Sequence, residues 1–328
     1  MSKLRNVRHR LIKLFLLMAL PLILITTCHH PVIQQPDTLI HNLEGSAECQ
    51  VVQHALGETC IPLHPHRIVV LDQYYILDSI SALGMKPVGF TPCLICTPPD
   101  TLSKFVAGIA SVGDMGNPSL EKILSLKPDL ILGLTWQKSF YSLLSNIAPT
   151  VMIEDPEISG FKETLKYLAR ILNRSDQVEE ILAEYNGKIQ SFRRQFGEKL
   201  KAKTVAVIYL PSSSAFVVHK PEFTIYGQVM IDAGIQLVPA YKNLKSDGYN
   251  TISIENLTDW DADFLFVLAN YKRDSENLKS LSFLKQPIWS TLKAVQNKRV
   301  HPMILDVSGP ITANQFVDDL HAYFANIP

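Results

Sequence analysis

Residues 161–200 carry a long helical pattern that separates two similar halves of the chain. Apolar side chains recur along it at steps of three and four. The segment Asn173-Arg174-Ser175 interrupts the pattern, and Asp176 followed by Glu179 is a capping pair, so a second helix is predicted from Asp176 to about Lys199. Such a helix would extend roughly 36 Å, which is long enough to span a domain. A helix of this kind usually packs against one sheet. Here strand-helix-strand patterns flank it on both sides, which favours a helix that bridges two halves.

Each half alternates short apolar runs with amphipathic segments, a pattern typical of an α/β fold. Strands are expected at residues 67–71, 86–90, 111–113, 130–134 and 151–153, and then at 204–209, 235–238, 263–268 and 299–305. Helices are expected at 76–83, 118–126, about 143–147, 227–233, from residue 253, 289–295 and 315–324, with a polar, aromatic loop at 211–223. We therefore predict two Rossmann-like lobes with parallel sheets, bridged by one long α-helix. In this interpretation residues 29–48 are a linker, 49–160 the first lobe, 161–200 the helical connector and 201–328 the second lobe.

Residues 1–28 are expected to be an export signal and not part of the fold. A basic segment precedes an apolar run at 14–25, which is too short to span a membrane comfortably but fits a signal peptide. The run ends at Ile25-Thr26-Thr27-Cys28, which resembles a bacterial lipobox, although Thr27 stands where Gly, Ala or Ser is usual. A lipidated Cys28 is the first expectation. Ordinary signal cleavage and an uncleaved anchor are the alternatives, and each of them exports the body of the protein.

Export places the remaining four cysteines in an oxidising compartment. Cys49 and Cys60 flank a hairpin-like turn at 55–58, so we expect a disulfide across that hairpin. Cys93 and Cys96 have the spacing of a redox motif but lie in a Pro-rich loop. A second disulfide or a pair of loop thiols is therefore favoured over catalysis.

Composition and missing motifs argue against several other functions. The 31 basic and 31 acidic residues give a formal net charge of zero, so no nucleic-acid partner is expected. No Gly-x-Gly-x-x-Gly, Gly-x-Ser-x-Gly or His-Glu-x-x-His pattern occurs. His64-Pro65-His66 has no third ligand nearby, so no metal site is expected. The serines at 212–214 lie near His219, and we interpret them as a polar loop and not as a nucleophile with its base.

A series of short segments occurs in a specific order and spacing, although no single one is diagnostic. They are residues 65–71, 82–89, 118–123, 126–132, 147–151, 253–257, 260–263 and 289–295. Together they resemble the substrate-binding proteins of bacterial iron-siderophore, haem and cobalamin ABC importers, over residue 49 to the C-terminus. The segment 49–62 is most similar to ferric-siderophore binders of cyanobacteria.

The resemblance implies the class III periplasmic binding protein fold, with the ligand held in a cleft between two lobes. It implies a monomer that docks on the dimeric permease of an inner-membrane ABC importer through one Glu per lobe. Glu121 and Glu255 occupy the matching positions. A Glu in the first turn of a helix is also favoured by the helix dipole alone. The dipole does not explain why both lobes carry it in the same motif. The expected location is the periplasm, with a lipid anchor at Cys28.

The implied ligand is a ferric siderophore, a bulky, oxygen-rich chelate that leaves no iron position open to the protein. Its site should offer aromatic walls and a few cationic or hydroxyl donors. Candidates at the predicted strand exits are Tyr74, Tyr75, Trp136, Lys138, Phe216, His219, Tyr226, Tyr271, Lys272 and Arg273. Asp114, Met115 and Gly116 stand where some hydroxamate-binding relatives carry an Arg, so their mode of clamping is not transferred. No resident cofactor or metal is expected.

Four rival interpretations stay open. Haem is an alternative ligand, with His219 or a Tyr as its axial ligand, and cobalamin is another. An exported enzyme on a two-lobed frame, or a scaffold or adhesin tethered through Cys28, would be a different class of protein.

Overall fold

The computed structural model describes residues 48–93, 100–211, 214–245, 248–269, 287–304 and 307–325. The first lobe holds a sheet of five strands in the order β5-β4-β3-β8-β9. These strands are β3 (Ile68–Val70), β4 (Gly89–Phe90), β5 (Ala110–Ser111), β8 (Leu130–Leu134) and β9 (Thr150–Ile153). Every neighbouring pair is parallel, which confirms the prediction for this lobe. All residues of β8 are buried, as expected for a strand covered on both faces.

Helices cover both faces of this sheet. The helices of this lobe are α2 (Tyr75–Ala82), α3 (Asp100–Val106), α4 (Leu120–Ser125), η1 (Thr135–Phe140), α5 (Tyr141–Ser145) and α6 (Pro156–Ser159), and a small ladder is formed by β6 (Gly113–Asp114) and β7 (Asn117–Pro118). Side chains alternate along a strand, so Ile68 and Val70 pack with α2 whereas Val69 packs with α4 and α5.

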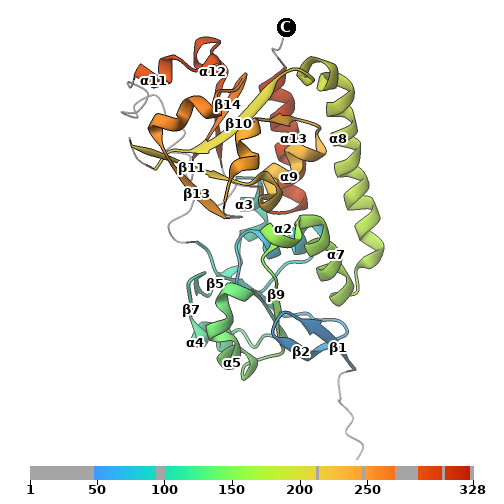
Figure 1. Ribbon diagram of the computed structural model, residues 1–328. Coiled ribbons are helices and arrows are strands. Elements are labelled where there is room, and N and C mark those ends of the chain that lie inside the picture. The colour runs from blue at the N-terminus through green and yellow to red at the C-terminus, as the bar shows by residue number, and fades with distance from the viewer. Residues whose placement is uncertain are drawn as a thin grey trace, which may run out of the picture. The chain divides into compact units, whose positions relative to one another are not determined.

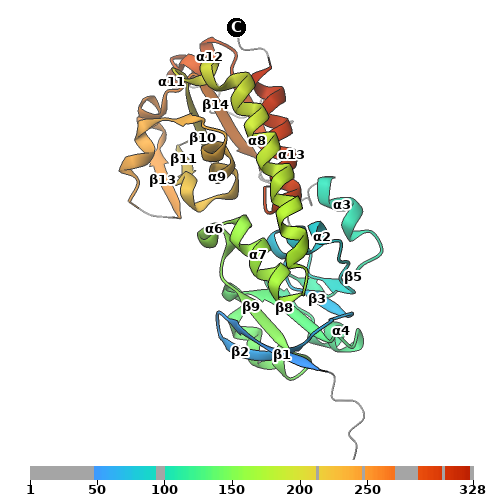
Figure 2. The same cartoon turned by 90° about the vertical axis from the view of Figure 1, so that its right-hand side faces the viewer.

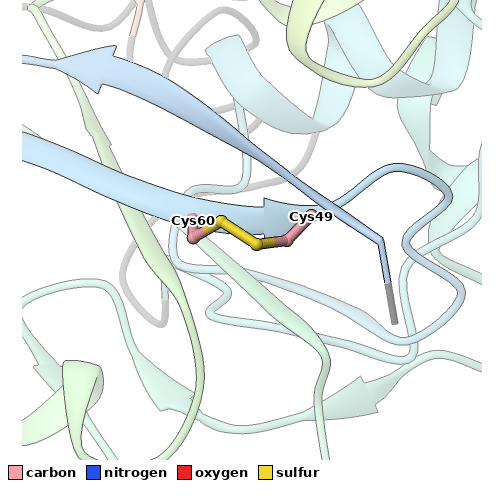
Figure 3. The surroundings of a disulfide bond; sticks show 2 residues. All are labelled: Cys49 and Cys60. Carbon is pink, nitrogen blue, oxygen red and sulfur yellow. A yellow bond between two sulfur atoms is a disulfide. The ribbon is translucent and has the colours of Figure 1, made fainter. Parts of the chain in front are cut away.

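A disulfide-linked hairpin precedes the first sheet. Strands β1 (Cys49–His54) and β2 (Gly57–Pro62) pair antiparallel, and Cys49 is bonded to Cys60 with a Cα–Cα distance of 5.6 Å (Figure 3). Gly57 has φ of +134°, which a glycine adopts readily in such a turn. Ile61 of β2 is fully buried in the core of the first lobe, so the hairpin is part of that lobe. Cys93 is also disulfide-bonded, and Cys96 lies outside the described residues.

The connector consists of α7 (Phe161–Ile171), the turn η2 (Ser175–Gln177) and α8 (Val178–Leu200). The interruption falls where the sequence predicts it, because Asn173 has φ of +55° and ends α7 with a left-handed residue. The predicted long helix is thus confirmed, with its first residues in a 3₁₀ turn. In both views α8 runs beside the last helix, α13 (Pro310–Phe324) (Figures 1 and 2).

The second lobe holds a mixed sheet in the order β13-β11-β10-β14-β15, with β12 paired to β10. Its strands are β10 (Thr204–Tyr209), β11 (Ala215–His219), β12 (Gln236–Leu237), β13 (Tyr249–Ser253), β14 (Phe264–Ala269) and β15 (Val300–Ile304). The other elements are η3 (Pro221–Phe223), α9 (Ile225–Asp232), η4 (Pro239–Asn243), η5 (Ile254–Trp260), α11 (Pro287–Ser290) and α12 (Lys293–Gln296).

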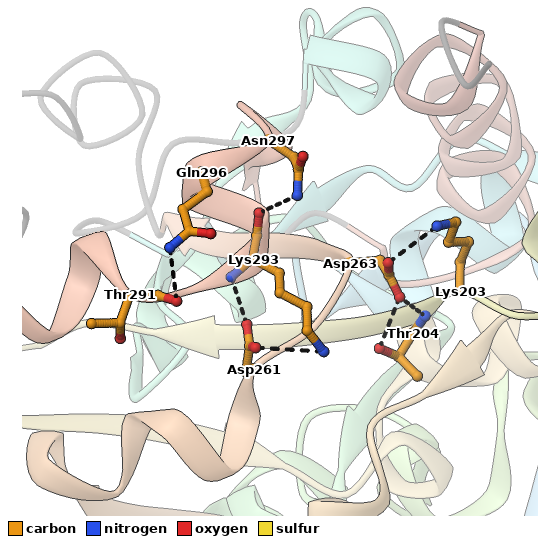
Figure 4. Close-up of polar contacts among 8 residues, drawn as sticks. All are labelled: Lys203, Thr204, Asp261, Asp263, Thr291, Lys293, Gln296 and Asn297. Atoms are coloured by element: carbon orange, nitrogen blue, oxygen red, sulfur yellow. Dashed lines mark hydrogen bonds and ion pairs between the residues drawn. The ribbon is translucent and has the colours of Figure 1, made fainter.

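The second sheet contains parallel strand pairs, as expected, and also two antiparallel pairs. The expectation of a loop at 211–223 is wrong. Strand β11 lies within that segment and pairs antiparallel with β10. Strand β13 in turn pairs antiparallel with β11. The predicted helix at 289–295 is two short helices, because Leu292 is extended and the Asp261 carboxylate accepts a hydrogen bond from the Lys293 backbone N–H at 2.7 Å (Figure 4). The segment opening at Ser253 is the 3₁₀ helix η5 and not an α-helix. In the described residues, no helix has the length and apolar character needed to cross a membrane.

The shifted pKa values of Asp72, Asp78 and Asp263 affect stability. Burial alone would raise the pKa of Asp263, but the Thr204 backbone N–H and Lys203 lower it overall (Figure 4). Asp72 and Asp78 are fully buried, and burial raises the pKa of Asp72 to about 7 and that of Asp78 to about 6, although both accept hydrogen bonds. Asp263 therefore stabilises the fold more as pH rises, and the two buried groups stabilise it less.

The packing of α8 predicts a large effect of truncating Phe192. Its ring lies 5.0 Å from that of Phe196 and 5.8 Å from that of Phe324, and it is fully buried. Phe192→Ala should lower the free energy of unfolding by about 3–5 kcal/mol in urea titrations, because it leaves a cavity. Gln190→Ala, an exposed change on the same helix, should be within about 0.5 kcal/mol of the original. Equal urea midpoints for the two variants would contradict this packing.

Opposite pH dependences are expected for two Asp→Asn variants. The folded state binds the Asp72 proton more tightly than the unfolded state does. The contribution of this proton binding to the free energy of unfolding is therefore complete below about pH 4, and it is lost as pH rises towards about 7. Asp72→Asn should therefore gain stability relative to the original chain at pH 8, on the order of a few kcal/mol, and little at pH 4. Asp263→Asn should lose stability at pH 7, and this loss should become smaller as pH falls below the ordinary pKa of an aspartate. Unfolding titrations across pH measure both differences, and parallel curves for all three proteins would contradict the assignment.

Candidate functional site

The carboxyl edge of the first sheet brings several of the predicted ligand residues together. Strands β3 and β8 are parallel neighbours, so the segments that follow them leave the sheet at the same edge. Tyr74 and Tyr75 follow β3 and are half-buried. Trp136 and Lys138 follow β8, and the Trp136 side chain is 48% exposed. These residues supply an indole, phenol groups and one ammonium to this edge.

Buried polar groups fix the backbone at this edge. The Gln137 side chain donates to the carbonyls of Leu71 at 2.7 Å and Met115 at 2.8 Å and accepts from the Leu134 N–H. This amide holds the η1 turn against β3 and so orients Trp136. Asp72 accepts from the Ile76 N–H at 2.8 Å and fixes the start of α2, where both tyrosines lie.

Polar atoms without a partner also occur at the ends of β3 and β4. Within the described ranges, Asp72 Oδ2, Gln73 Nε2 and Thr91 Oγ1 are buried and make no hydrogen bond. Such atoms are costly in a well-packed core, on the order of 1–3 kcal/mol each. Their concentration here marks this edge as more polar than the rest of the lobe core.

In the second lobe, an aromatic pair lies on the antiparallel strands. His219 of β11 stands directly opposite Tyr249 of β13, and their ring centroids are 4.4 Å apart in an edge-to-face arrangement. His219 Nδ1 is 3.3 Å from the Tyr226 hydroxyl, and burial lowers the pKa of His219. Burial therefore favours the neutral form of this imidazole. Tyr249 is 74% exposed, and sequence reasoning missed it because residues 249–253 were not recognised as a strand.

Phe216 does not fit the ligand set predicted from the sequence. Its side chain is fully buried and lies edge-on to Trp260, with ring centroids 5.9 Å apart, so it belongs to the core of the second lobe. The sequence predicts a loop here, but the segment forms a strand, whose side chains alternate between the two faces, and the Phe216 side chain points inward. Tyr226 is also largely buried. Tyr271, Lys272 and Arg273 lie outside the described residues.

Glu121 and Glu255 occupy similar local positions in the two lobes. Glu121 is exposed in the first turn of α4, whose N-cap Ser119 accepts a hydrogen bond from the Lys122 N–H. Glu255 is exposed in the first turn of η5. Both carboxylates are therefore free to meet a cationic partner, and the turns that carry them differ in helix type.

An open cavity lies away from all of these residues. It has a volume of about 550 Å³ and is lined by the hairpin, β9 and α7, including His54, Met152 and Tyr167. None of the predicted ligand residues lines it. In the same described part of the chain, no group of three or more His, Cys, Asp or Glu side chains could hold a metal ion.

Comparison with known proteins places these features in a family. Residues 68–303 match the model of the periplasmic binding protein family. The probable siderophore-binding lipoprotein YfiY of Bacillus subtilis is 32% identical over 85% of this chain and 89% of its own length. The iron(3+)-hydroxamate-binding protein FhuD of the same organism is 29% identical, covering 75% of this chain and 76% of that protein.

The fold is likewise similar to solved structures. Staphylococcus aureus SirA in complex with staphyloferrin B superimposes with a TM-score of 0.71 at 25% identity, covering 84% of this chain and 98% of that chain. Two α/β lobes bridged by one long helix are the class III periplasmic binding protein arrangement expected from the sequence. The chain therefore belongs to the periplasmic binding protein family, and it is a binding protein and not an enzyme.

Proposed function

We propose that this protein captures a ferric siderophore outside the cytoplasm and delivers it to the permease of an ABC importer. The observation that carries the proposal is the aromatic, weakly charged side-chain set at the carboxyl edge of the first sheet, on a fold shared with siderophore binders. Trp136 and Tyr74 offer flat apolar surfaces, and Lys138 offers a cation for a carboxylate or hydroxamate oxygen. The chelate carries the iron, so the protein needs no metal ligands of its own.

The second wall of the proposed site comes from the other lobe. His219 and the exposed Tyr249 form an aromatic pair on β11 and β13. A neutral imidazole can donate or accept a hydrogen bond without adding charge. This pair suits the organic shell of a chelate, and we add Tyr249 to the ligand set. Phe216 is not included, because it is buried.

The remaining partner and location assignments are part of the same proposal. Delivery would use Glu121 and Glu255, one from each lobe, against arginines of a dimeric permease, with the binding protein as a monomer. Paired rim charges of this kind set the orientation and rate of docking. Cys28 lies outside the described residues. A lipid anchor there is supported by the lipobox-like sequence and by the lipoprotein name of the relative YfiY.

The exposed indole makes ligand binding measurable. Of the three tryptophans, Trp260 and Trp289 are buried and Trp136 is exposed, so a ferric hydroxamate chelate at submicromolar concentration should quench fluorescence mainly through Trp136. Trp136→Ala should weaken binding about tenfold in calorimetry, because a stacking surface is lost. Leu143→Ala, at a similarly exposed apolar residue of the same lobe, should bind as the original does.

Two results would redirect the assignment. A chelate that binds both variants equally would remove Trp136 from the site. A Soret band on mixing with haemin, abolished by His219→Ala, would move the ligand to haem, since a neutral imidazole is the form that ligates iron.

The docking role separates uptake from affinity. Glu121→Gln combined with Glu255→Gln should abolish import of a radiolabelled ferric chelate by intact cells while the dissociation constant stays unchanged, because both residues are exposed. A control pair, Glu163→Gln with Glu198→Gln, removes two other exposed carboxylates and should import normally. Normal import by the first pair would refute the docking proposal.

A further inference from the structure

A buried carboxylate of the first lobe caps a helix of the second lobe. Asp78 lies on α2 with no exposed surface. Its Oδ1 accepts from the Ile311 N–H at 2.8 Å, and its Oδ2 accepts from the Thr312 N–H at 3.0 Å and from the Thr312 hydroxyl at 2.6 Å. Two of the N–H groups that α13 would leave unpaired are thus bonded to a side chain more than 230 residues earlier in the chain. A helix cap usually comes from the adjoining segment.

The start of α13 is shaped to admit this carboxylate. A Cβ placed on Gly309 would lie 2.6 Å from Asp78 Cγ and 2.7 Å from Asp78 Oδ1, so a side chain at this position would force the Asp78 side chain or one of the two helices to shift. The Thr312 hydroxyl accepts from the Ser308 and Gly309 N–H groups at 2.8 and 3.0 Å and donates to Asp78. The Thr312 hydroxyl and the Asp78 carboxylate are thus both hydrogen-bonded within this cluster.

The contact joins two separate hydrophobic cores. Neighbours of Asp78 on α2, such as Leu77 and Ile80, are buried in the core of the first lobe. Residues that follow on α13, such as Phe316 and Leu320, are buried in the core of the second. Tyr75 packs against both cores. Moving α13 relative to α2 would therefore move one lobe relative to the other.

We propose that Asp78 is a positioning residue of the ligand site, which sets the relative orientation of the two lobes through the first turn of α13. It acts through that helix and touches no ligand. The inference rests on the proposed function, because it assumes that both lobes contribute to one site. Without this contact the lobes would sample more orientations. The apparent affinity would then fall in proportion to the fraction of molecules whose lobes are oriented for binding.

Thr312→Val is the sharpest variant. It keeps the volume and shape of the side chain but removes the hydroxyl, whereas Thr312→Ser keeps the hydroxyl and should restore function. Asp78→Asn is a second variant, because its amide nitrogen would face a backbone N–H where an acceptor is needed. Asp318→Asn is the matched control. It makes the same chemical change on α13, where Asp318 forms an exposed ion pair with Lys188.

Two measurements on full-length protein in detergent test the proposal. The first is the affinity for a ferric hydroxamate chelate. The second is the distance distribution between spin labels at two exposed residues, Ser125 of α4 and Ser290 of α11, attached through unnatural ketone side chains that spare the native cysteines. Thr312→Val should broaden the distribution and weaken binding about tenfold. Thr312→Ser and Asp318→Asn should keep the distance distribution of the original protein. Their dissociation constants should lie within about threefold of its value.

The outcomes are separable. A narrow, unshifted distribution for Thr312→Val, or affinity equal to the original while thermal unfolding shows lost stability, would reduce Asp78 to a purely structural residue and overturn the inference. If the unmodified protein binds no ferric chelate, the proposed function fails on the first measurement. The distance distribution alone then decides whether Asp78 orients the lobes.

Discussion

The arrangement depends on the burial of one face of α8. Val178, Ile181 and Leu182 near its start pack against the core of the first lobe, and Tyr185 to Leu200 pack along the core of the second. Leu182 contacts both cores. If α8 lost either contact, a stripe of its large apolar side chains would be exposed to water, at a cost of about 25 cal/mol per Å². The two lobes are therefore held to one rod by the same hydrophobic effect that forms each core.

Polar contacts add orientation to this hydrophobic attachment. The Asp232 carboxylate of α9 accepts from Lys162 of α7 at 2.6 Å and from the Tyr185 hydroxyl of α8 at 2.7 Å, which ties the connector to the second lobe. The Asp78 contact ties the first lobe to α13 at a different place. Hydrophobic burial tolerates sliding, whereas hydrogen bonds are directional. Together they make a fixed relation between α2, α8 and α13 more favourable than many alternatives.

The sequence predicts best those helices and strands that are determined by interactions within one segment. The long helix, β8 and β10 were found nearly to the residue, because their apolar periodicity and flanking turn residues lie within one segment. Strands β11 and β13 were missed because each becomes a strand only by pairing with the other, about 34 residues away. The start of α13 was placed five residues late, at 315 instead of Pro310, since its first turn is capped by a distant carboxylate that no local pattern reveals.

The candidate site divides in the same way. Tyr74, Trp136 and Lys138 were predicted from strand ends, and the order of a parallel sheet brings strand ends together. Phe216 was misplaced and Tyr249 overlooked, because the face on which a side chain lies depends on strand register, which a single sequence does not specify.

The close approach of Gly309 to Asp78 has an evolutionary consequence. A methyl group at 309 is incompatible with an aspartate at 78, and a carboxylate at 78 without its hydroxyl partner at 312 would be buried with one fewer donor. The residues at positions 78, 309 and 312 should therefore be conserved or replaced together during evolution. Relatives without an acidic residue at the position of Asp78 should also tolerate residues other than glycine at the position of Gly309. Different contacts would join the two lobes of such relatives.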